Sequence, residues 1–231
     1  MKQRIFAILL SLTMMFTLVP TAWALNEEEN RTPAPMETSE NGEGAGGSGS
    51  VASAMSGDCG EAGHESDVQW ALDQTTGVLT IFGTGAMGDY AFTNNSGKMH
   101  TTAPWKDFDA DIKRVVIESG VTKIGSHAFF MCNNLESVSI PEGVTTIEDR
   151  AFWQTSLKNI TIPASVTQIG SKVKEVFYQC YDLESITVAN DNTAYRSVDG
   201  VLYTADGTTL IQYPQNKADT SYKMTHFLLR H

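Results

Sequence analysis

Apolar residues recur at fixed positions in a short segment that the chain repeats. In one copy Leu135, Val138 and Ile140 are apolar, and the positions between them are polar. The corresponding residues of the other copies are Ile112, Val115 and Ile117, then Leu157, Ile160 and Ile162, then Leu183, Ile186 and Val188. Alternation of apolar and polar residues is typical of a β-strand with one buried face. We therefore predict one strand in each copy.

The spacing of the copies predicts how these strands are arranged. The copies that begin at Ile112, Leu135, Leu157 and Leu183 are separated by 23, 22 and 26 residues. A period of this length with the pattern L-x-x-V-x-I is the signature of leucine-rich repeats. Each repeat has too few apolar groups to fold alone, so its stability must come from stacking on its neighbours. The predicted fold class is a mainly β leucine-rich-repeat solenoid.

Each repeat continues in a fixed order after its first strand. A second short extended segment follows at 121–124, 144–147 and 166–169, and a large aromatic ring comes next, at Phe129, Phe152 and Phe177. The chain then reaches Cys132, Thr155 or Cys180 before the next copy begins. We expect the three phenylalanine rings to lie in a shared core, because a continuous interior is what stacked repeats bury.

A different pattern precedes the repeats. Val68, Trp70 and Leu72 alternate with polar or small residues, the segment 74–77 has turn-forming residues, and Leu79 and Ile81 alternate again. This pattern predicts a β-hairpin with one apolar face. Trp70 is expected in the core, where the hairpin would cover the first repeat, since a solenoid needs its terminal core sealed. The segment 90–102 is polar and is expected to be irregular.

The N-terminal residues indicate the compartment. A charged start, an apolar run and the small residues Ala22 and Ala24 form a secretory signal peptide. The acidic, Gly- and Ser-rich stretch that follows has too little apolar surface to order itself. The predicted division is a signal peptide at 1–24, a disordered linker at 25–57, a β cap at 58–108, repeats at 109–224 with a hairpin insertion at 195–214, and an atypical tail at 225–231. We expect a secreted or cell-surface protein with no membrane span after cleavage.

The three cysteines do not form a disulfide framework. Cys132 and Cys180 occupy the same place in repeats that are not adjacent. Two strand spacings separate them by about 10 Å, beyond the roughly 7 Å Cα distance that a disulfide spans. They are predicted to be buried free thiols, and Cys59 is also predicted to be free.

The repeat unit resembles the BspA-like family of bacterial leucine-rich repeats. The residues that carry the resemblance are Ile124, Gly125, Ala128, Phe129, Cys132, Leu135, Val138, Ile140, Pro141, Val144 and Ile147. The cap and the insertion, with Asp206 and Gly207 at a tight turn, are also similar to that family. The resemblance implies a right-handed solenoid in an exported or surface protein used for adhesion and protein binding. The particular ligand does not carry over.

The chain departs from the family pattern in two places. The second repeat lacks the cysteine and is one residue shorter before Leu157. After Met224 the family would resume its repeat, whereas this chain ends in 225–231, which reads as a truncation. We expect an uncapped apolar end there, which favours end-to-end self-association.

No set of residues in the sequence points to a reaction. His64, His100, His127, His226 and His231 share no spacing with one another or with the cysteines, and no zinc, P-loop or nucleophile-elbow motif occurs. His127 is expected at the surface. The sequence therefore predicts no catalytic residues, no metal site and no cofactor. The net charge of −11 repels phosphates, so nucleic acid is not an expected partner.

Two surface ladders are the candidate binding sites. Polar side chains between the core positions of the first strands form one, namely Ser137, Ser139, Asn159, Thr161, Ser185 and Thr187. Such residues also suit an exposed strand that binds nothing. The residues directly after the core phenylalanines, Phe130, Trp153 and Tyr178, form the other. These rings can grip a ligand or equally pack against one another.

The predicted function is non-catalytic adhesion. The partner would be a host or neighbouring-cell protein or a glycan. A structural spacer within a larger surface protein is the first alternative, and an enzyme is the least supported one because no acid, base, nucleophile or metal set converges.

Overall fold

The computed structural model describes residues 55–95, 98–171 and 175–218. The chain divides into two units, Met1–Ser48 and Gly49–His231. The first unit, the predicted signal peptide, the linker up to residue 54 and the tail at 225–231 lie outside the described residues. The described part is mainly β, as predicted, with short 3-10 turns such as η1 (Glu65–Asp67) and η2 (Lys106–Phe108) and no α-helix.

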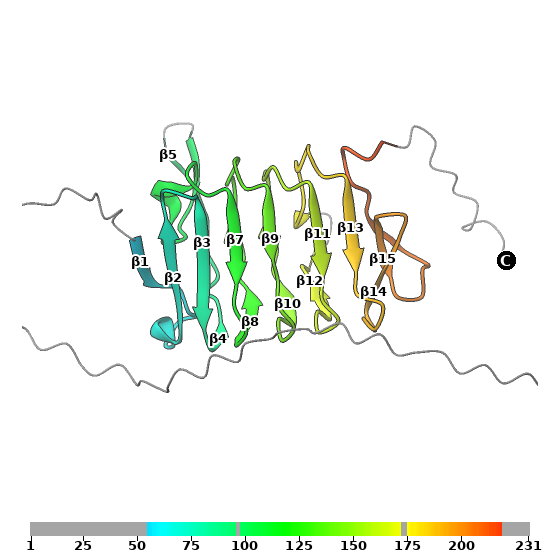
Figure 1. Ribbon diagram of the computed structural model, residues 1–231, viewed down its shortest axis with the longest axis horizontal. Helices are drawn as coiled ribbons and strands as arrows, with labels where there is room; N and C mark the ends of the chain where they lie inside the picture. Colours follow the sequence, from blue (N-terminus) through cyan, green and yellow to red (C-terminus); the bar gives the residue numbers. More distant parts are fainter. Residues whose placement is uncertain (1–54, 96–97, 172–174, 219–231) are drawn as a thin grey trace, which may run out of the picture. The chain divides into compact units, whose positions relative to one another are not determined.

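The first strands of the repeats lie side by side. These strands are β7 (Arg114–Ile117), β9 (Ser137–Ser139), β11 (Asn159–Ile162) and β13 (Ser185–Val188), and they run in one direction in Figure 1. β7 pairs with β9 so that Val115 faces Val138, and β11 pairs with β13 so that Ile160 faces Ile186. The register of the sequence copies is therefore confirmed as the register of the strands.

The join between β9 and β11 is looser than the others. The backbone N–H of Lys158 donates to the Glu136 carbonyl at 3.4 Å, but β9 and β11 belong to separate ladders. Val138 and Ile140 of this repeat are only partly buried, whereas the corresponding residues of the other repeats are buried. One short repeat thus interrupts an otherwise regular sheet.

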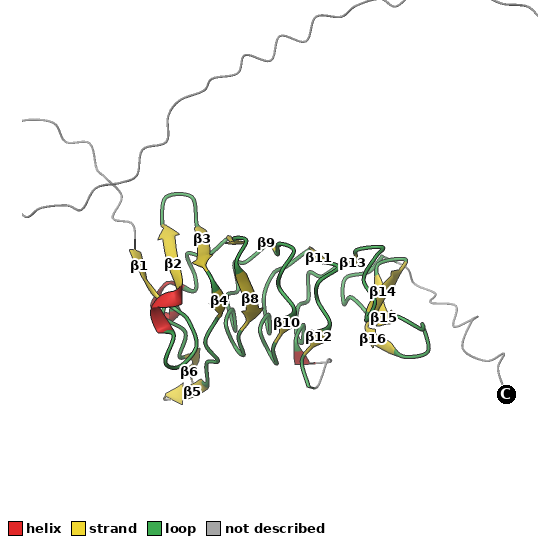
Figure 2. Cartoon of the chain, turned by 90° about the horizontal axis from the view of Figure 1, so that it is seen from below, coloured by secondary structure: helices red, strands yellow, loops and turns green. Residues whose placement is uncertain are grey.

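A second sheet and a turn complete each repeat. Figure 2 shows β4 (Gly85–Ala86), β8 (Val121–Ile124), β10 (Thr146–Ile147) and β12 (Gln168–Ile169) in succession, and all of their pairings are parallel. The aromatic turns are also joined, since Phe129 N–H donates to the Ala151 carbonyl at 2.9 Å and Phe152 N–H to that of Val176 at 3.1 Å. Adjacent repeats are therefore bonded through the backbone on three sides.

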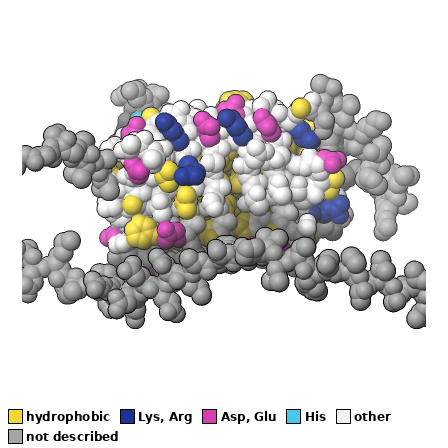
Figure 3. All heavy atoms as spheres, viewed as in Figure 1, with side chains coloured by type: hydrophobic (Ala, Val, Ile, Leu, Met, Phe, Trp, Pro, Cys, Tyr) yellow, Lys and Arg dark blue, Asp and Glu magenta, His cyan; other side chains and the backbone are white. Residues whose placement is uncertain are grey.

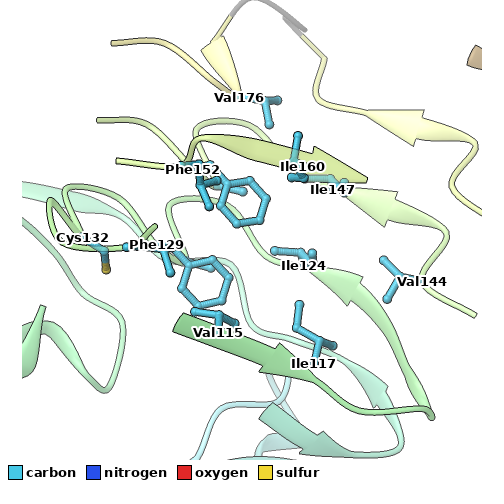
Figure 4. Packing of buried hydrophobic residues seen from close by; sticks show 14 of the residues in the cluster. Val115, Ile117, Ile124, Phe129, Cys132, Val144, Ile147, Phe152, Ile160 and Val176 are labelled. Carbon is cyan, nitrogen blue, oxygen red and sulfur yellow. The ribbon is translucent and has the colours of Figure 1, made fainter. Parts of the chain in front are cut away.

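The core contains a column of aromatic rings. Phe129, Phe152 and Phe177 are fully buried, as predicted, with ring centroids 5.4 and 5.8 Å apart and planes within 20° of parallel. Figure 4 shows Phe129 and Phe152 among aliphatic side chains of both sheets, such as Val115 and Ile124. The rings fill the space between the sheets, and each covers the next.

Trp105 extends this column into the cap. Its ring stacks on Phe129 at 5.6 Å, and its Nε1 donates to the Ala128 carbonyl at 2.9 Å. Trp70 and Tyr90 meet its ring edge-on at 5.9 and 5.8 Å. Trp70 is buried, as predicted, and Trp105 is the residue that joins the cap to the first phenylalanine.

The cap has more order than the sequence pattern indicated. β2 (Val68–Asp73) and β3 (Val78–Gly83) form the predicted antiparallel hairpin, and β3 continues parallel to β7. β1 (Met55–Asp58) pairs with β2, so the linker prediction is wrong at residues 55–57. The pairing with β2 orders a segment whose own composition is too polar to fold.

The polar segment before the repeats is also structured. It contains β5 (Phe92–Asn95) and β6 (Lys98–Thr101), an antiparallel pair that belongs to neither large sheet. The prediction of irregular structure at 90–102 is wrong, because the two strands satisfy each other's backbone groups without an alternating apolar face. The Thr101 hydroxyl donates to the His127 carbonyl at 2.9 Å, which attaches this hairpin to the first repeat.

The insertion is a three-stranded antiparallel sheet made of β14 (Tyr195–Val198), β15 (Val201–Thr204) and β16 (Leu210–Gln212). Its two-residue turn is at Asp199 and Gly200, which both have positive φ, as a type I′ hairpin turn requires. The tight turn predicted at Asp206 and Gly207 is present, since the Gly207 N–H donates to the Thr204 carbonyl at 2.8 Å, and it lies within the loop that joins β15 to β16. Gly200 also accepts a backbone hydrogen bond from Ile186 of β13 at 2.8 Å, so the insertion covers that strand's edge.

Asn192 attaches the insertion to the repeats. Its side-chain amide donates to the carbonyls of Pro163 and Val166 at 2.7 and 2.9 Å. Its oxygen accepts from the backbone N–H groups of Ala194 and Tyr195. This buried amide is therefore fully hydrogen-bonded, as a buried polar group must be to avoid a large desolvation cost.

Candidate binding surfaces

The first candidate surface is the outward face of the first-strand sheet, which we call the sheet face. Its members are Ser137, Ser139, Asn159, Thr161, Ser185 and Thr187, all exposed except the half-buried Ser185. The strand register places Asn159 opposite Ser185 and Thr161 opposite Thr187, and Ser137 and Ser139 lie on the neighbouring strand β9. The structure therefore brings together all six predicted residues of this surface.

The sheet face is flat, polar and neutral. Figure 3 shows it mostly white over β9, β11 and β13, whereas hydrophobic side chains gather toward the cap. Ser185 Oγ donates to Asn159 Oδ1 at 2.7 Å. The other four hydroxyls form no side-chain hydrogen bond within the described part of the chain, so their donors and acceptors are available to a partner.

A row of alternating charges borders the sheet face. The residue after the first apolar position of each copy is exposed, and these residues are Lys113, Glu136, Lys158 and Glu184. Lys158 Nζ lies 3.2 Å from Glu136 Oε2. Both groups are solvent-exposed, so the pair adds little stability, but the alternating signs keep this border neutral. The sequence analysis missed this row, although its fixed place in each copy was a usable signal.

The second candidate surface is a row of aromatic rings on the outside of the turns, which we call the outer aromatic row. The predicted members are adjacent, with Phe130 and Trp153 centroids 5.9 Å apart and Trp153 and Tyr178 4.4 Å apart. Phe92 from β5 stacks on Phe130 at 6.0 Å and is a fourth member. No repeat pattern includes Phe92, so no signal in the sequence identified it.

Exposure increases along this row from repeat to repeat. Phe130 is 3% exposed because Phe92 covers it, Trp153 is half-buried, and Tyr178 is 45% exposed. The rings therefore pack against one another, as one of the two predicted alternatives required. They also leave aromatic surface accessible at the C-terminal end of the row.

His127 lies beneath this row rather than at the surface. Its ring is half-buried between Phe92 and Phe130, at 5.7 and 5.5 Å, so the surface prediction is wrong. The error arises because Phe92 reaches it from a distant hairpin. Burial lowers the pKa of His127, and the charge of Arg150 acts in the same direction. Neither ring nitrogen, nor Nε1 of Trp153, has a hydrogen-bond partner among the described residues.

Arg150 contributes the positive charge closest to the aromatic rings. Its guanidinium lies 5.1 Å from the Trp153 ring centre and 5.8 Å from that of Phe92. Its Nε donates to Glu175 Oε2 at 2.8 Å, and both side chains are about a quarter exposed. The cation is thus shared between a carboxylate and two aromatic faces, which leaves the row close to neutral.

Comparison with known proteins agrees with this geometry. Residues 108–204 match the family described as BspA type leucine rich repeat region, in six copies. These residues are a BspA-type leucine-rich repeat region. The predicted family resemblance is therefore confirmed, and no curated protein matches the chain.

The solved structures similar to this chain come from bacteria. A leucine-rich repeat protein from Eubacterium ventriosum is 27% identical with a TM-score of 0.40, over 72% of this chain and 53% of that one. The pneumococcal vaccine antigen PcpA is 18% identical with a TM-score of 0.42, over 74% and 58%. A leucine rich cell surface protein from Faecalibacterium prausnitzii is 23% identical with a TM-score of 0.35, over 66% and 61%. The chain thus spans between half and two thirds of the length of these structures.

The three thiols are buried and unpaired, as predicted. Burial, followed by the charge of Asp58, raises the pKa of the Cys59 thiol to about 12. Burial also raises the pKa of Cys132 and of Cys180. Cys180 Sγ donates to the Phe152 carbonyl at 3.0 Å and lies 3.3 Å from the Thr155 hydroxyl. These thiols fill the core and are not suited to act as nucleophiles.

Within residues 55–95, 98–171 and 175–218, no three His, Cys, Asp or Glu side chains are placed to hold a metal ion. In the same ranges no helix has the length and apolar character needed to cross a bilayer. A hollow of about 320 Å³ in the cap is lined by Thr93, His100, Thr101, Thr102, Lys106 and Asp107. None of these residues belongs to the sheet face or to the outer aromatic row.

Proposed function

We propose that this chain is a right-handed leucine-rich-repeat solenoid, secreted or at the cell surface, that acts as a non-catalytic binding module. Its sheet face binds a partner protein. One observation carries the proposal, namely the small polar side chains on the outward side of β9, β11 and β13, which are in register between β11 and β13. Extended surfaces formed by stacked repeats are used in this way by repeat proteins.

The chemistry of the sheet face favours a protein over a glycan. Its six members are hydroxyl or amide side chains and include no aromatic ring, so it has no platform on which a sugar ring can stack. Four unbonded hydroxyls and a neutral border suit a hydrogen-bonded, flat contact. A protein interface needs about 1,200–2,000 Å² of total buried surface, which requires a broad face of this kind rather than a pocket.

The placement of the thiols and of His127 within the described residues supports the non-catalytic part of the proposal. The buried thiols have raised pKa values, and His127 has a lowered pKa beneath aromatic rings. Neither arrangement activates a nucleophile or positions a general base toward an open cavity.

The test is a double substitution on the sheet face. Ser139→Arg with Thr161→Arg places two long cations in the middle of the sheet face, and we expect saturable binding to a panel of purified extracellular matrix proteins to be lost. Thr122→Arg with Thr167→Arg is the matched control, because it makes the same charge change at exposed positions of the second-strand side. Urea unfolding should give the same midpoint for both variants and the parent.

Two outcomes contradict the proposal. Binding that survives the sheet-face substitutions removes the sheet face as the site. A parent chain that binds no protein saturably indicates the structural spacer role instead.

A further inference from the structure

We propose that the outer aromatic row is a second binding site, separate from the sheet face, and that it takes a neutral glycan chain. The row lies on the turns, which form a different side of each repeat from the first-strand sheet. The site goes beyond the protein-binding role proposed above and does not depend on it.

Accessible ring surface is the first requirement for a sugar site. Tyr178 and Phe92, at the two ends of the row, are each 45% exposed. Tyr178 contacts the Trp153 ring on one side and has no further ring contact among the described residues. The apolar C–H faces of sugar rings pack on exposed aromatic faces of this kind.

Amide groups lie next to the exposed rings. Gln154 follows Trp153 and Gln179 follows Tyr178, both with positive φ and half-buried. Neither amide side chain has a hydrogen-bond partner among the described residues. Trp153 Nε1 is also unpaired there, but it is buried and is not offered to a ligand. Amides donate and accept hydrogen bonds, as sugar hydroxyls do. An aliphatic partner would leave the two amides unsatisfied, whereas a hydroxyl-rich chain can bond them.

The charge around the row favours a neutral ligand. Arg150 is neutralised by Glu175 at 2.8 Å and lies over Trp153. The whole chain carries a net charge of −11, which repels acidic polysaccharides and nucleic acids at long range. A neutral glycan is not repelled by the net negative charge, and it does not need an unpaired cation to bind.

The repeating arrangement favours a polymer over a single sugar. Each turn supplies one ring, and neighbouring centroids are 6.0, 5.9 and 4.4 Å apart. Phe130 is covered by Phe92, so a ligand with its own repeating units can place units against the accessible rings, Trp153 and Tyr178 above all, and weak contacts then add along the row.

The test is native gel electrophoresis of the full chain through soluble polysaccharides. The neutral probes are xyloglucan, galactomannan and mixed-linkage β-glucan, and polygalacturonate is the anionic comparison. We expect at least one neutral probe to retard migration and polygalacturonate not to. Tyr178→Ala should weaken the retarding interaction about tenfold or more, since truncated aromatic anchors dominate such contacts. Gln179→Ala should weaken it less.

Matched variants make the outcome specific to the row. Tyr181 is 64% exposed but has no ring contact with the row, so Tyr181→Ala should retain binding within about twofold. Ser139→Arg with Thr161→Arg should leave glycan binding unchanged, which separates this site from the sheet face. Retardation by no neutral probe, or equal losses in Tyr178→Ala and Tyr181→Ala, would overturn the proposal. The proposal would also be overturned if the parent chain bound no glycan and Tyr178→Ala lost binding to a protein partner. The row would then be a protein interface.

Discussion

Two aromatic columns run through this molecule, and in each of three repeats their rings are one residue apart along the chain, but they differ in almost every other respect. The inner column, Trp105, Phe129, Phe152 and Phe177, has centroids 5.4 to 5.8 Å apart, planes 3° to 20° from parallel and no exposed ring. In the outer aromatic row the centroids are 4.4 to 6.0 Å apart and the planes 28° to 45° apart, and exposure increases toward Tyr178.

The difference follows from where each ring points. Both columns belong to the same turns, which are joined by the same backbone hydrogen bonds. The inner rings enter a dry space between two sheets, where close packing permits one ring shape and one orientation. The outer rings point away from that space, so Phe130, Trp153 and Tyr178 differ in type, tilt and exposure. The buried inner ring of each repeat is therefore structural, whereas the outer ring, which is less constrained by packing, can acquire a binding role.

Removing an inner ring should have the largest effect. Phe152→Ala leaves a cavity between two stacked rings, and we expect the free energy of unfolding to fall by about 3–5 kcal/mol. Urea unfolding followed by circular dichroism measures this. Phe152→Leu should cost much less because it keeps most of the volume, and a small loss for the alanine variant would mean that the column is not the core.

Removing the neighbouring outer ring should cost less. Trp153→Ala deletes a half-buried ring and its contact with Arg150, and we expect a loss of about 1–2 kcal/mol from the packing and cation–π contributions. The same urea experiment gives the value. A loss as large as that of Phe152→Ala would erase the distinction between the columns.

His127, beneath the outer row, should make stability depend on pH. Burial lowers its pKa in the folded chain, so below the unfolded-state pKa of about 6.5 the unfolded chain binds the proton more readily. The free energy of unfolding is therefore highest above that pH, and it decreases as the pH falls from the unfolded-state pKa toward the folded-state pKa. His127→Asn removes the titration and tolerates the positive φ. Thermal unfolding from pH 7.5 to 5.5 should be flatter for this variant, and an unchanged slope would count against the burial of His127.

The backbone of the outer turn can be tested at Gln154. Its φ of 55° is costly for a residue with a side chain, so Gln154→Gly should raise stability by about 0.5–1 kcal/mol. Gly143, with φ 105° and open space around it, gives the reciprocal control, since Gly143→Ala should lower stability for the same reason. Urea unfolding midpoints test both variants. A lower midpoint for Gln154→Gly, or a higher one for Gly143→Ala, would contradict the turn geometry.

The smallest effect should come from the exposed end of the row. Tyr178→Ala should change the free energy of unfolding by about 0.5 kcal/mol or less, because Tyr178 is 45% exposed and contacts one ring at the end of the row. Its unfolding midpoint should match that of Tyr181→Ala. A large loss would show that Tyr178 is structural and would weaken its assignment to a glycan site.

The repeat pattern by itself determined the strand register, the buried phenylalanines, the unpaired thiols and the six residues of the sheet face. These features follow from short-range periodicity, because equivalent residues of stacked repeats must lie against each other. The tertiary structure alone decided the rest. Phe92 covers Phe130 from a hairpin with no repeat pattern, and Phe92 also leaves His127 half-buried. Trp105 joins the cap to the core column, and β1 pairs with β2. Such contacts join segments distant in sequence that share no period, so only the folded chain brings them together.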